Sequence, residues 1–272
     1  MTKVRNMFDS IAGDYDSLNH ILSLDVDKIW RKKALKQIVD APAPARVLDL
    51  ACGTGDFSIA IAKALSRSHK RVGTPIEAHV KAPAKVPVEA QVTSTGFVTG
   101  DSGRSDLMTK GHVTGVDLSE GMLAVMREKV AKAGLTEMIS IEEGDGENLR
   151  FPDNTFDRVT IAFGIRNFED RPKGLREMLR VLKPGGRLVI LELSRPENKI
   201  IRWFYDLYFL HILPKVGGKV SGDKAAYAYL PASVAAFPSK KAFMATMREA
   251  GFRAVTHKAF TLGICRMYTG EK

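Results

Sequence analysis

Small and acidic residues at three points along the chain have the types and the order needed to hold a nucleoside. A glycine turn, Gly53-Thr54-Gly55, directly follows the apolar run 46–50. Asp117 ends a second apolar run, and Asp145-Gly146 follows a third. Glycine lets the backbone approach a ligand, and one carboxylate can accept hydrogen bonds from both hydroxyls of a ribose. The order therefore predicts ribose at Asp117 and an adenine edge at Asp145 and Gly146.

The glycine spacing favours a nucleoside that is held without phosphates. A dinucleotide-binding turn would carry a third glycine at position 58, and Ser58 stands there instead. S-adenosylmethionine is a ligand of the phosphate-free kind, so the pattern predicts it as the cofactor. The alternative is that Asp117 and Asp145 only cap the helices or loops that follow them.

These residues can meet only where an α/β sheet brings the ends of its strands to one edge. Apolar runs predict seven strands, and no helical pattern separates the last two, so we expect those two to be antiparallel neighbours. The predicted fold is an α/β protein with a seven-stranded, mostly parallel sheet. The predicted strands are 46–50, 112–117, 139–143, 156–163, 187–193, 254–260 and 264–268. The predicted helices are 26–39, 56–65, 120–133, 173–182 and 239–250.

Three segments lie outside the strand-and-helix pattern of a predicted single domain over 1–272. Residues 1–40 read as an N-terminal helical cap, with Ile29 and Trp30 on one apolar side of its second helix. Residues from about 66 to 110 are rich in Pro, Gly and Ser and far exceed a usual loop, which predicts an insertion. Residues from about 195 to 236 are mostly helical. Their stretch 200–213 is apolar on nearly every face, which is typical of a buried helix and also of a lid or channel wall for a long apolar tail; we favour the second.

The composition limits the function classes. Two cysteines, Cys52 and Cys265, cannot form a disulfide framework or a Cys-rich zinc site, and no cluster of residues suggests a metal. No apolar run reaches the roughly 18 residues that span a bilayer, so we expect a soluble intracellular protein. The net charge of +10 would attract a membrane surface, nucleic acid or a charged ligand, or would serve only solubility.

Four motifs resemble those of the ubiquinone/menaquinone biosynthesis C-methyltransferases. The segment Tyr15–Ser23, followed by Trp30, is similar to the first signature of that family, and Arg180–Ser194 is similar to the second. The segments 151–157 and 163–168 also match, and the resemblance covers nearly the whole chain except about 70–110. It implies the class I fold of S-adenosylmethionine-dependent methyltransferases. In that case 195–236 would be a helical substrate lid.

The resemblance also implies a reaction, the transfer of a methyl group to a ring carbon of a polyprenylated quinol. We favour demethylmenaquinol as the substrate and menaquinone biosynthesis as the role. The alternative is the same C-methylation of a methoxy-polyprenyl-benzoquinol in ubiquinone biosynthesis. An alternative of another class, motivated by the charge, is a nucleic-acid methyltransferase or binding protein. Nucleic-acid amino-methylases carry Asn-Pro-Pro-Tyr after the fourth strand, where this chain has Ala162-Phe163-Gly164.

The implied cofactor site places the methionine part near Asp49 and Thr54, within the turn formed by Gly53 and Gly55. Two positions depart from the general pattern. Ala51 stands where many methyltransferases have their first glycine, and Ala162 stands where some relatives have a ligand-contacting serine.

The reaction needs a deprotonated quinol hydroxyl, since the phenolate raises the electron density on the adjacent carbon. A phenol has a pKa near 10, so a base or a positive charge is needed at neutral pH. Candidates are Tyr15 and His20 in the first signature and Arg166 and Asn167 after the fourth strand. His20 is the ordinary base, and Arg166 would hold the phenolate. Asn167 could equally be a helix cap.

An apolar quinol tail implies contact with a bilayer. We therefore expect a cytoplasmic protein that binds peripherally at the inner face of the membrane, and a homo-oligomer is compatible with the sequence. Basic residues flanking 200–213 are the candidates for contact with anionic lipid: Lys199, Arg202, Lys215, Lys219 and Lys224.

Overall fold

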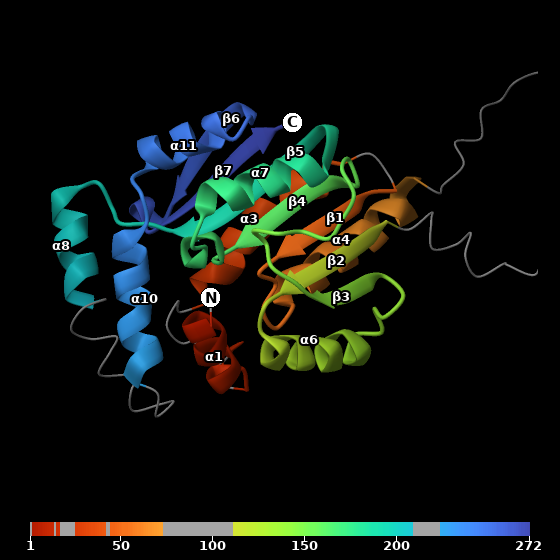
Figure 1. The fold of residues 1–272 in the computed structure, drawn as a ribbon, viewed down its shortest axis with the longest axis horizontal. Coiled ribbons are helices and arrows are strands. Elements are labelled where there is room, and N and C mark those ends of the chain that lie inside the picture. The colour runs from red at the N-terminus through yellow and green to blue at the C-terminus, as the bar shows by residue number, and fades with distance from the viewer. Residues whose placement is uncertain (1, 14, 17–24, 42–43, 73–110, 209–223) are drawn as a thin grey trace, which may run out of the picture.

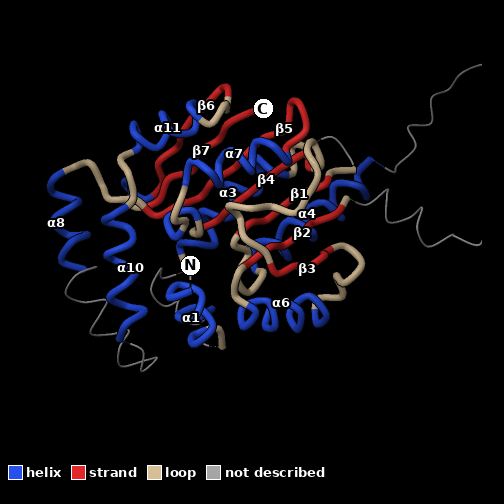
Figure 2. Tube along the Cα trace, viewed as in Figure 1, coloured by secondary structure: helices blue, strands red, loops and turns tan. Residues whose placement is uncertain are grey.

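The computed structural model describes residues 2–13, 15–16, 25–41, 44–72, 111–208 and 224–272. Within these residues seven strands form one central sheet with helices around it (Figures 1 and 2). The strands are β1 (Arg46–Leu50), β2 (His112–Asp117), β3 (Ile139–Glu143), β4 (Phe156–Ala162), β5 (Leu182–Leu193), β6 (Arg253–Phe260) and β7 (Cys265–Glu271).

The strand order β3-β2-β1-β4-β5-β7-β6 confirms the predicted fold class. The first five strands pair in parallel, and β7 pairs antiparallel with both β5 and β6. The order reverses between β1 and β4, and ligands of open α/β sheets bind beyond the carboxyl ends of the strands at such a point. The register aligns these ends, since Leu50 lies beside both Val116 and Ile161.

The helices and short 3-10 turns divide between the two faces of the sheet and its carboxyl edge. They are α1 (Thr2–Ile11), α3 (Val26–Ile38), α4 (Asp56–Val72), α6 (Glu120–Lys132), η1 (Ile165–Asn167), α7 (Arg171–Val181), α8 (Lys199–Leu207), α10 (Lys224–Ala236), α11 (Lys240–Glu249) and η3 (Thr261–Gly263). Figure 1 shows α8 and α10 at one side of the molecule, away from α4 and β3.

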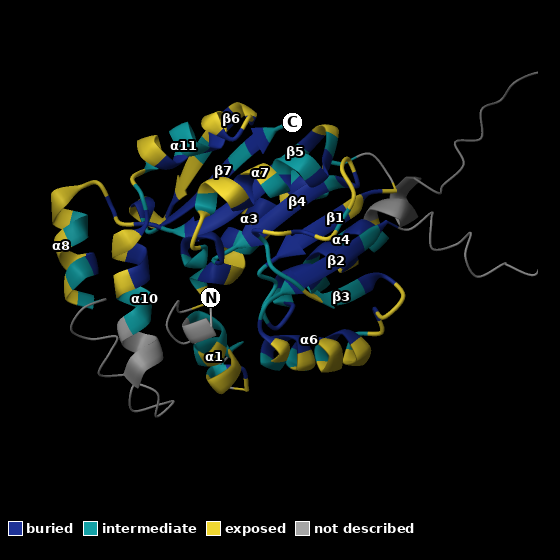
Figure 3. Cartoon of the chain, in the orientation of Figure 1, coloured by how far each residue is buried: buried dark blue, intermediate teal, exposed yellow. Residues whose placement is uncertain are grey.

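The core is two apolar layers, one on each face of the sheet. Helices α3, α4 and α6 pack against one face with Val47, and α7 and α11 pack against the other with Leu48 and Leu50. Successive side chains of a strand point to opposite faces, so a strand buried on both sides is apolar at nearly every position. Strands β1, β2, β4 and β5 accordingly form the buried centre of Figure 3, whereas the edge strand β6 is largely exposed. The exception in β1 is Asp49, which is 1% exposed.

Three local predictions differ from the structure. Helix α4 runs to Val72, so 66–72 continue a helix and do not belong to the insertion; residues 73–110 lie outside the described residues. The side chain of Ile29 is 54% exposed, so it does not share the buried side of Trp30. Strand β5 begins at Leu182 and passes through the predicted turn Pro184-Gly185-Gly186, where its register with β4 shifts.

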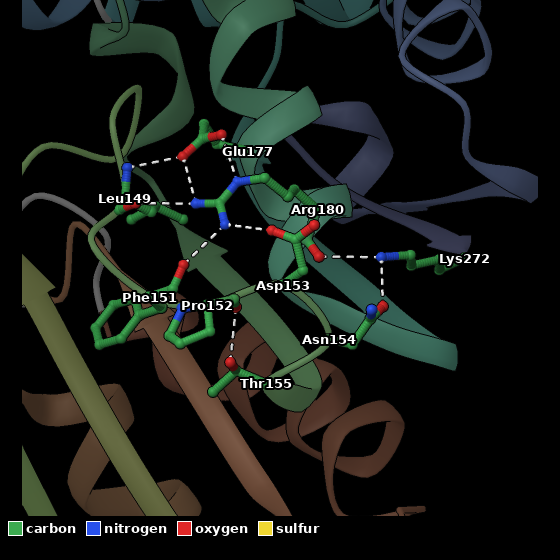
Figure 4. Close-up of polar contacts among 9 residues, drawn as sticks. All are labelled: Leu149, Phe151, Pro152, Asp153, Asn154, Thr155, Glu177, Arg180 and Lys272. Carbon is green, nitrogen blue, oxygen red and sulfur yellow. Dashed lines mark hydrogen bonds and ion pairs between the residues drawn. The ribbon is translucent and has the colours of Figure 1, made fainter.

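One residue of the second signature, Arg180, holds the loop that leads into β4 (Figure 4). Its guanidinium donates to the carbonyl oxygens of Leu149 and Phe151 at 2.9 and 2.8 Å and pairs with the carboxylates of Glu177 and Asp153. An Arg fork is suited to several fixed acceptors at once. This signature residue therefore has a structural role and positions the start of β4.

Candidate functional site

A cavity opens at the carboxyl edge of the sheet, where the strand order reverses. It encloses about 820 Å³ of empty space, part of it open to solvent. Its walls come from the turns after β1, β2, β3 and β4, and from α1. The predicted site residues that line it are Tyr15, Gly53, Asp117, Asp145, Gly146 and Asn167.

Asp117 connects two walls of the cavity. Its Oδ2 accepts a hydrogen bond from the backbone nitrogen of Gly53 at 2.9 Å, and its Oδ1 accepts one from Ser119 at 2.9 Å. Burial raises the pKa of the Asp117 carboxyl, and these backbone donors act in the opposite direction. Each carboxylate oxygen has a further lone pair, so Asp117 can still accept the two hydroxyls of a ribose.

The glycine turn has the backbone that the sequence predicted. Gly53 and Gly55 have φ of 56° and 83°, in the left-handed region. A Cβ on Gly55 would lie 2.4 Å from Cγ of Met126, so the turn also lies tightly against α6. Ala51 adopts φ of 49° although it is not a glycine, which costs about 1 kcal/mol. The departure from the usual glycine is therefore tolerated with backbone strain beside the cavity.

The loop after β3 forms the end of the cavity predicted for adenine. Asp145 Oδ1 accepts a hydrogen bond from the nitrogen of Glu147 at 2.8 Å, which shapes this loop. A Cβ on Gly146 would lie 2.5 Å from the ring of Phe168, so only glycine fits against that ring. Glu147 in turn accepts from the nitrogens of Glu169 and Asp170 and ties the loop to the segment after η1.

Asp49 lies beneath the glycine turn and does not line the cavity. Its Oδ2 accepts a hydrogen bond of 2.6 Å from the hydroxyl of Ser58, the residue that replaces the third glycine of a dinucleotide turn. Burial raises the pKa of Asp49 to about 7, and the bond from Ser58 opposes this shift. Direct contact between Asp49 and the methionine part of the cofactor stays a prediction. In the structure Asp49 supports the turn from below.

Helix α1 covers the cavity. Val4, Arg5 and Phe8 line the cavity together with Tyr15, whose ring lies edge-on to Phe8 at 6.0 Å. The carboxylate of Asp9 accepts from the hydroxyl of Ser119 at 2.5 Å and from the nitrogen of Gly121 at 3.1 Å. No motif in the sequence marks these α1 residues as part of the site.

A second polar contact fastens the N-terminal segment to the glycine turn. Thr54 donates its hydroxyl hydrogen to Asp16 Oδ1 at 2.5 Å, and Asp16 Oδ2 pairs with Lys129 at 2.7 Å. Lys129 also pairs with Asp56 at the start of α4. Thr54 is buried and does not line the cavity, and in the structure its hydroxyl holds Asp16 in place.

The candidate catalytic residues separate into two groups. Tyr15 and Asn167 line the cavity. Arg166 does not; its Nη1 pairs with Glu192 Oε1 at 2.9 Å, and both side chains are almost completely buried. Contact between Arg166 and a substrate phenolate therefore stays a prediction, and in the structure the Arg166 guanidinium is held by the buried carboxylate of Glu192. His20 lies outside the described residues.

The cavity fits S-adenosylmethionine. The carboxylate of Asp117 can accept the ribose hydroxyls, and Gly53 lets the backbone come close to the ligand. At the other end of the cavity, the loop at Gly146 leaves room for the flat adenine ring. Aromatic side chains of Phe8, Phe163 and Phe168 complete the wall.

Comparison with solved structures shows which known fold the chain shares. A SAM-dependent methyltransferase from Aquifex aeolicus has a TM-score of 0.52 to this chain, with 20% identity and 88% of each chain covered. The strand order and this likeness together show the fold of the S-adenosylmethionine-dependent methyltransferases, as predicted.

Comparison of sequences then defines the family. The model of the ubiE/COQ5 methyltransferase family matches residues 1–272. The Geobacter sulfurreducens ubiquinone/menaquinone biosynthesis C-methyltransferase UbiE is 43% identical over 99% of this chain and 88% of its own length. The Bacteroides fragilis demethylmenaquinone methyltransferase is 39% identical over 99% of this chain and 92% of its own. The chain belongs to the ubiE/COQ5 methyltransferase family, and the resemblance found in the sequence is confirmed.

Replacement of Asp117 tests the ribose end of the site. Asp117→Ala removes two charge-assisted hydrogen bonds and should weaken S-adenosylmethionine binding by roughly 1–3 kcal/mol, or about 5- to 150-fold. Titration calorimetry measures the affinity, and a thermal melt confirms that the variant is folded. Glu120→Ala is the matched control, since this exposed acid lies three residues away and pairs with Arg127. Unchanged affinity of Asp117→Ala would remove Asp117 from the site.

Replacement of Asp49 tests its burial. The raised pKa means that the folded protein binds this proton more tightly than the unfolded chain, so wild type loses stability as pH rises from about 4 to about 7. Asp49→Asn removes that loss. Its free energy of unfolding relative to wild type should rise by about 3 kcal/mol between pH 5 and pH 8, measured by chemical denaturation. A difference that does not change with pH would show that the folded carboxyl ionises like an exposed one.

Proposed function

We propose that the protein transfers a methyl group from S-adenosylmethionine to a ring carbon of demethylmenaquinol and forms menaquinol. The observation that carries this proposal is the 39% identity to a demethylmenaquinone methyltransferase, which extends over 99% of the chain and so includes the whole cavity. A peripheral position at the cytoplasmic face of the membrane belongs to the same proposal, because the substrate tail is apolar.

A methoxy-polyprenyl-benzoquinol is the second candidate substrate. It is favoured by the relative of 43% identity, whose name includes ubiquinone as well as menaquinone biosynthesis. The two candidates share the same chemistry and differ in the ring that the cavity must accept.

S-adenosylmethionine, when bound, supplies a methyl group that its sulfonium activates for transfer. The work of the protein is to align the quinol carbon with that methyl and to favour the phenolate form of the quinol. Tyr15 and Asn167 are the candidate catalytic residues on the cavity wall, and hydrogen-bond donors there would lower the pKa of a quinol hydroxyl. His20 remains the candidate base.

The apolar part of the wall supports the same reaction. Phe8, Phe163 and Phe168 give the wall an apolar surface, and hydrogen bonds to a phenolate are stronger in apolar surroundings. Phe163 has φ of 62°, so backbone strain marks the point where β4 ends at the cavity.

The decisive experiment compares the two quinols side by side in their reduced forms. The purified protein with radiolabelled S-adenosylmethionine should methylate demethylmenaquinol with a higher kcat/KM than the benzoquinol. The oxidised quinones should not react, since they have no hydroxyl to deprotonate. Transfer to the benzoquinol alone would establish the second candidate, and transfer to neither would reject the proposal.

Helix α8 is the proposed membrane-binding element. Ile200, Trp203, Phe204 and Leu207 are 70%, 62%, 60% and 40% exposed, and their spacing places them on one side of the helix. On the other side of the helix Tyr205 is buried, and Asp206 forms an ion pair with Arg195 at 2.5 Å. An outward apolar stripe of this kind suits insertion at a lipid interface. It also shows that 199–207 is not a helix buried on every side.

The basic residues around α8 differ in how freely their side chains could meet anionic lipid. Lys199 is exposed, whereas Arg202 donates to the carbonyl oxygens of Pro196 and Glu197 and is partly engaged. Lys215 and Lys219 lie outside the described residues. Across the part of the chain that the structure describes, no helix combines the length and apolar character needed to cross a bilayer.

Vesicle flotation tests the role of α8. Wild type should float with phosphatidylglycerol vesicles at low salt, more weakly at high salt, and weakly with phosphatidylcholine. Trp203→Ser with Phe204→Ser should lower partitioning at least 10-fold, because two aromatic side chains no longer enter the interface. Ile29→Ser, an exposed apolar residue of α3, is the control. Equal flotation of the double variant and wild type would show that α8 is not the membrane-binding element. Equal binding to both lipids would show that the basic residues do not contribute to membrane binding.

A further inference from the structure

Helix α10 contacts a residue of the cavity wall through the hydroxyl group of Tyr229. Tyr229 Oη donates a hydrogen bond of 2.8 Å to Asn167 Oδ1, and Asn167 lines the cavity wall. We propose that Tyr229 is a positioning residue, which fixes the Asn167 amide so that its nitrogen and not its oxygen faces the quinol oxygen. This inference rests on the proposed function and adds a residue to its machinery.

The two ends of an amide have opposite effects on a phenolate. The NH₂ group of Asn167 offers two donors, which stabilise a developing negative charge, whereas the carbonyl oxygen would repel it. The hydrogen bond from Tyr229 occupies the oxygen and leaves the donors available. A phenol is a better donor than acceptor because its lone pairs are delocalised into the ring. Burial raises the pKa of Tyr229, so the hydroxyl keeps its hydrogen.

The backbone that carries Asn167 is fixed independently of Tyr229. Glu192 is fully buried and accepts from the Arg166 nitrogen at 3.1 Å and from its guanidinium at 2.9 Å. The nitrogen of Asn167 donates to the carbonyl oxygen of Gly164 at 3.0 Å. Since these bonds hold η1 in place, the orientation of the Asn167 amide is the variable that Tyr229 determines.

A neighbouring contact provides the matched control. Ser233 lies one turn after Tyr229 on the same side of α10, and its hydroxyl accepts from Arg166 Nε at 3.3 Å. Both hydroxyls therefore join α10 to η1, but only that of Tyr229 touches Asn167. A variant of Ser233 perturbs the attachment of α10 to η1 and leaves the hydrogen bond between Tyr229 and the Asn167 side chain intact.

The experiment is a double-mutant cycle measured with demethylmenaquinol. Tyr229→Phe should lower kcat about 10-fold with little change in the KM for S-adenosylmethionine, the effect of losing roughly one hydrogen bond in the transition state. The rising limb of the pH–rate profile should move to higher pH, because the phenolate loses its donors. Asn167→Ala should lose at least as much activity, and adding Tyr229→Phe to it should cause no further loss. Ser233→Ala should leave the pH profile of wild type unchanged.

Two results would overturn the inference. One is an equal loss with an equal pH shift in Tyr229→Phe and Ser233→Ala, which would assign both to the attachment of α10. The other is a full effect of Tyr229→Phe in the Asn167→Ala background, which would show that Tyr229 acts without Asn167. Thermal melts establish that each variant is folded. If wild type methylates neither quinol, the proposed function fails; if wild type is active and Tyr229→Phe equals it, only this inference fails.

Discussion

The arrangement of the site depends on the carboxylate of Asp117. It joins the backbone of Gly53, after β1, to that of Ser119, at the start of α6. The Ser119 hydroxyl then caps α6 by accepting from Met122 and donates to Asp9 of α1. One continuous chain of hydrogen bonds therefore runs from the glycine turn to the helix that covers the cavity. Loss of the Asp117 carboxylate would therefore disturb the cavity wall, the N-terminal end of α6 and the position of α1 together.

Different forces hold the sheet and its cover. Apolar layers on both faces fix the strands, and their ends at the carboxyl edge are rigid as a result. Helix α1 is attached chiefly by polar contacts, namely Asp9 to Ser119 and Arg5 to Glu143 at 2.8 Å. Elements held by few apolar contacts open at a lower free-energy cost than the core. We therefore expect α1 to open more readily than the sheet edge beneath it.

The sequence alone predicted those cavity-lining residues whose position depends only on where a strand ends. Gly53 and Gly146 follow apolar strands and Asp117 ends one, and parallel strands bring such positions to one edge. Partners that are distant in sequence could not be found in this way. The position of Arg166 depends on Glu192, 26 residues later, and the role of Asp9 depends on Ser119, 110 residues later. The burial of Asp49 beneath the turn likewise follows from the packing of α4 through Ser58.

The central claim is that the cavity under α1 is the cofactor site and that Asp117 orders it. A crystal structure of the protein with S-adenosylhomocysteine tests this most directly. We expect both ribose hydroxyls within hydrogen-bond distance of Asp117, the adenine between Gly146 and the cavity wall, and α1 closed over the ligand. A ligand bound away from Asp117, or one whose ribose turns away from that carboxylate, would contradict it.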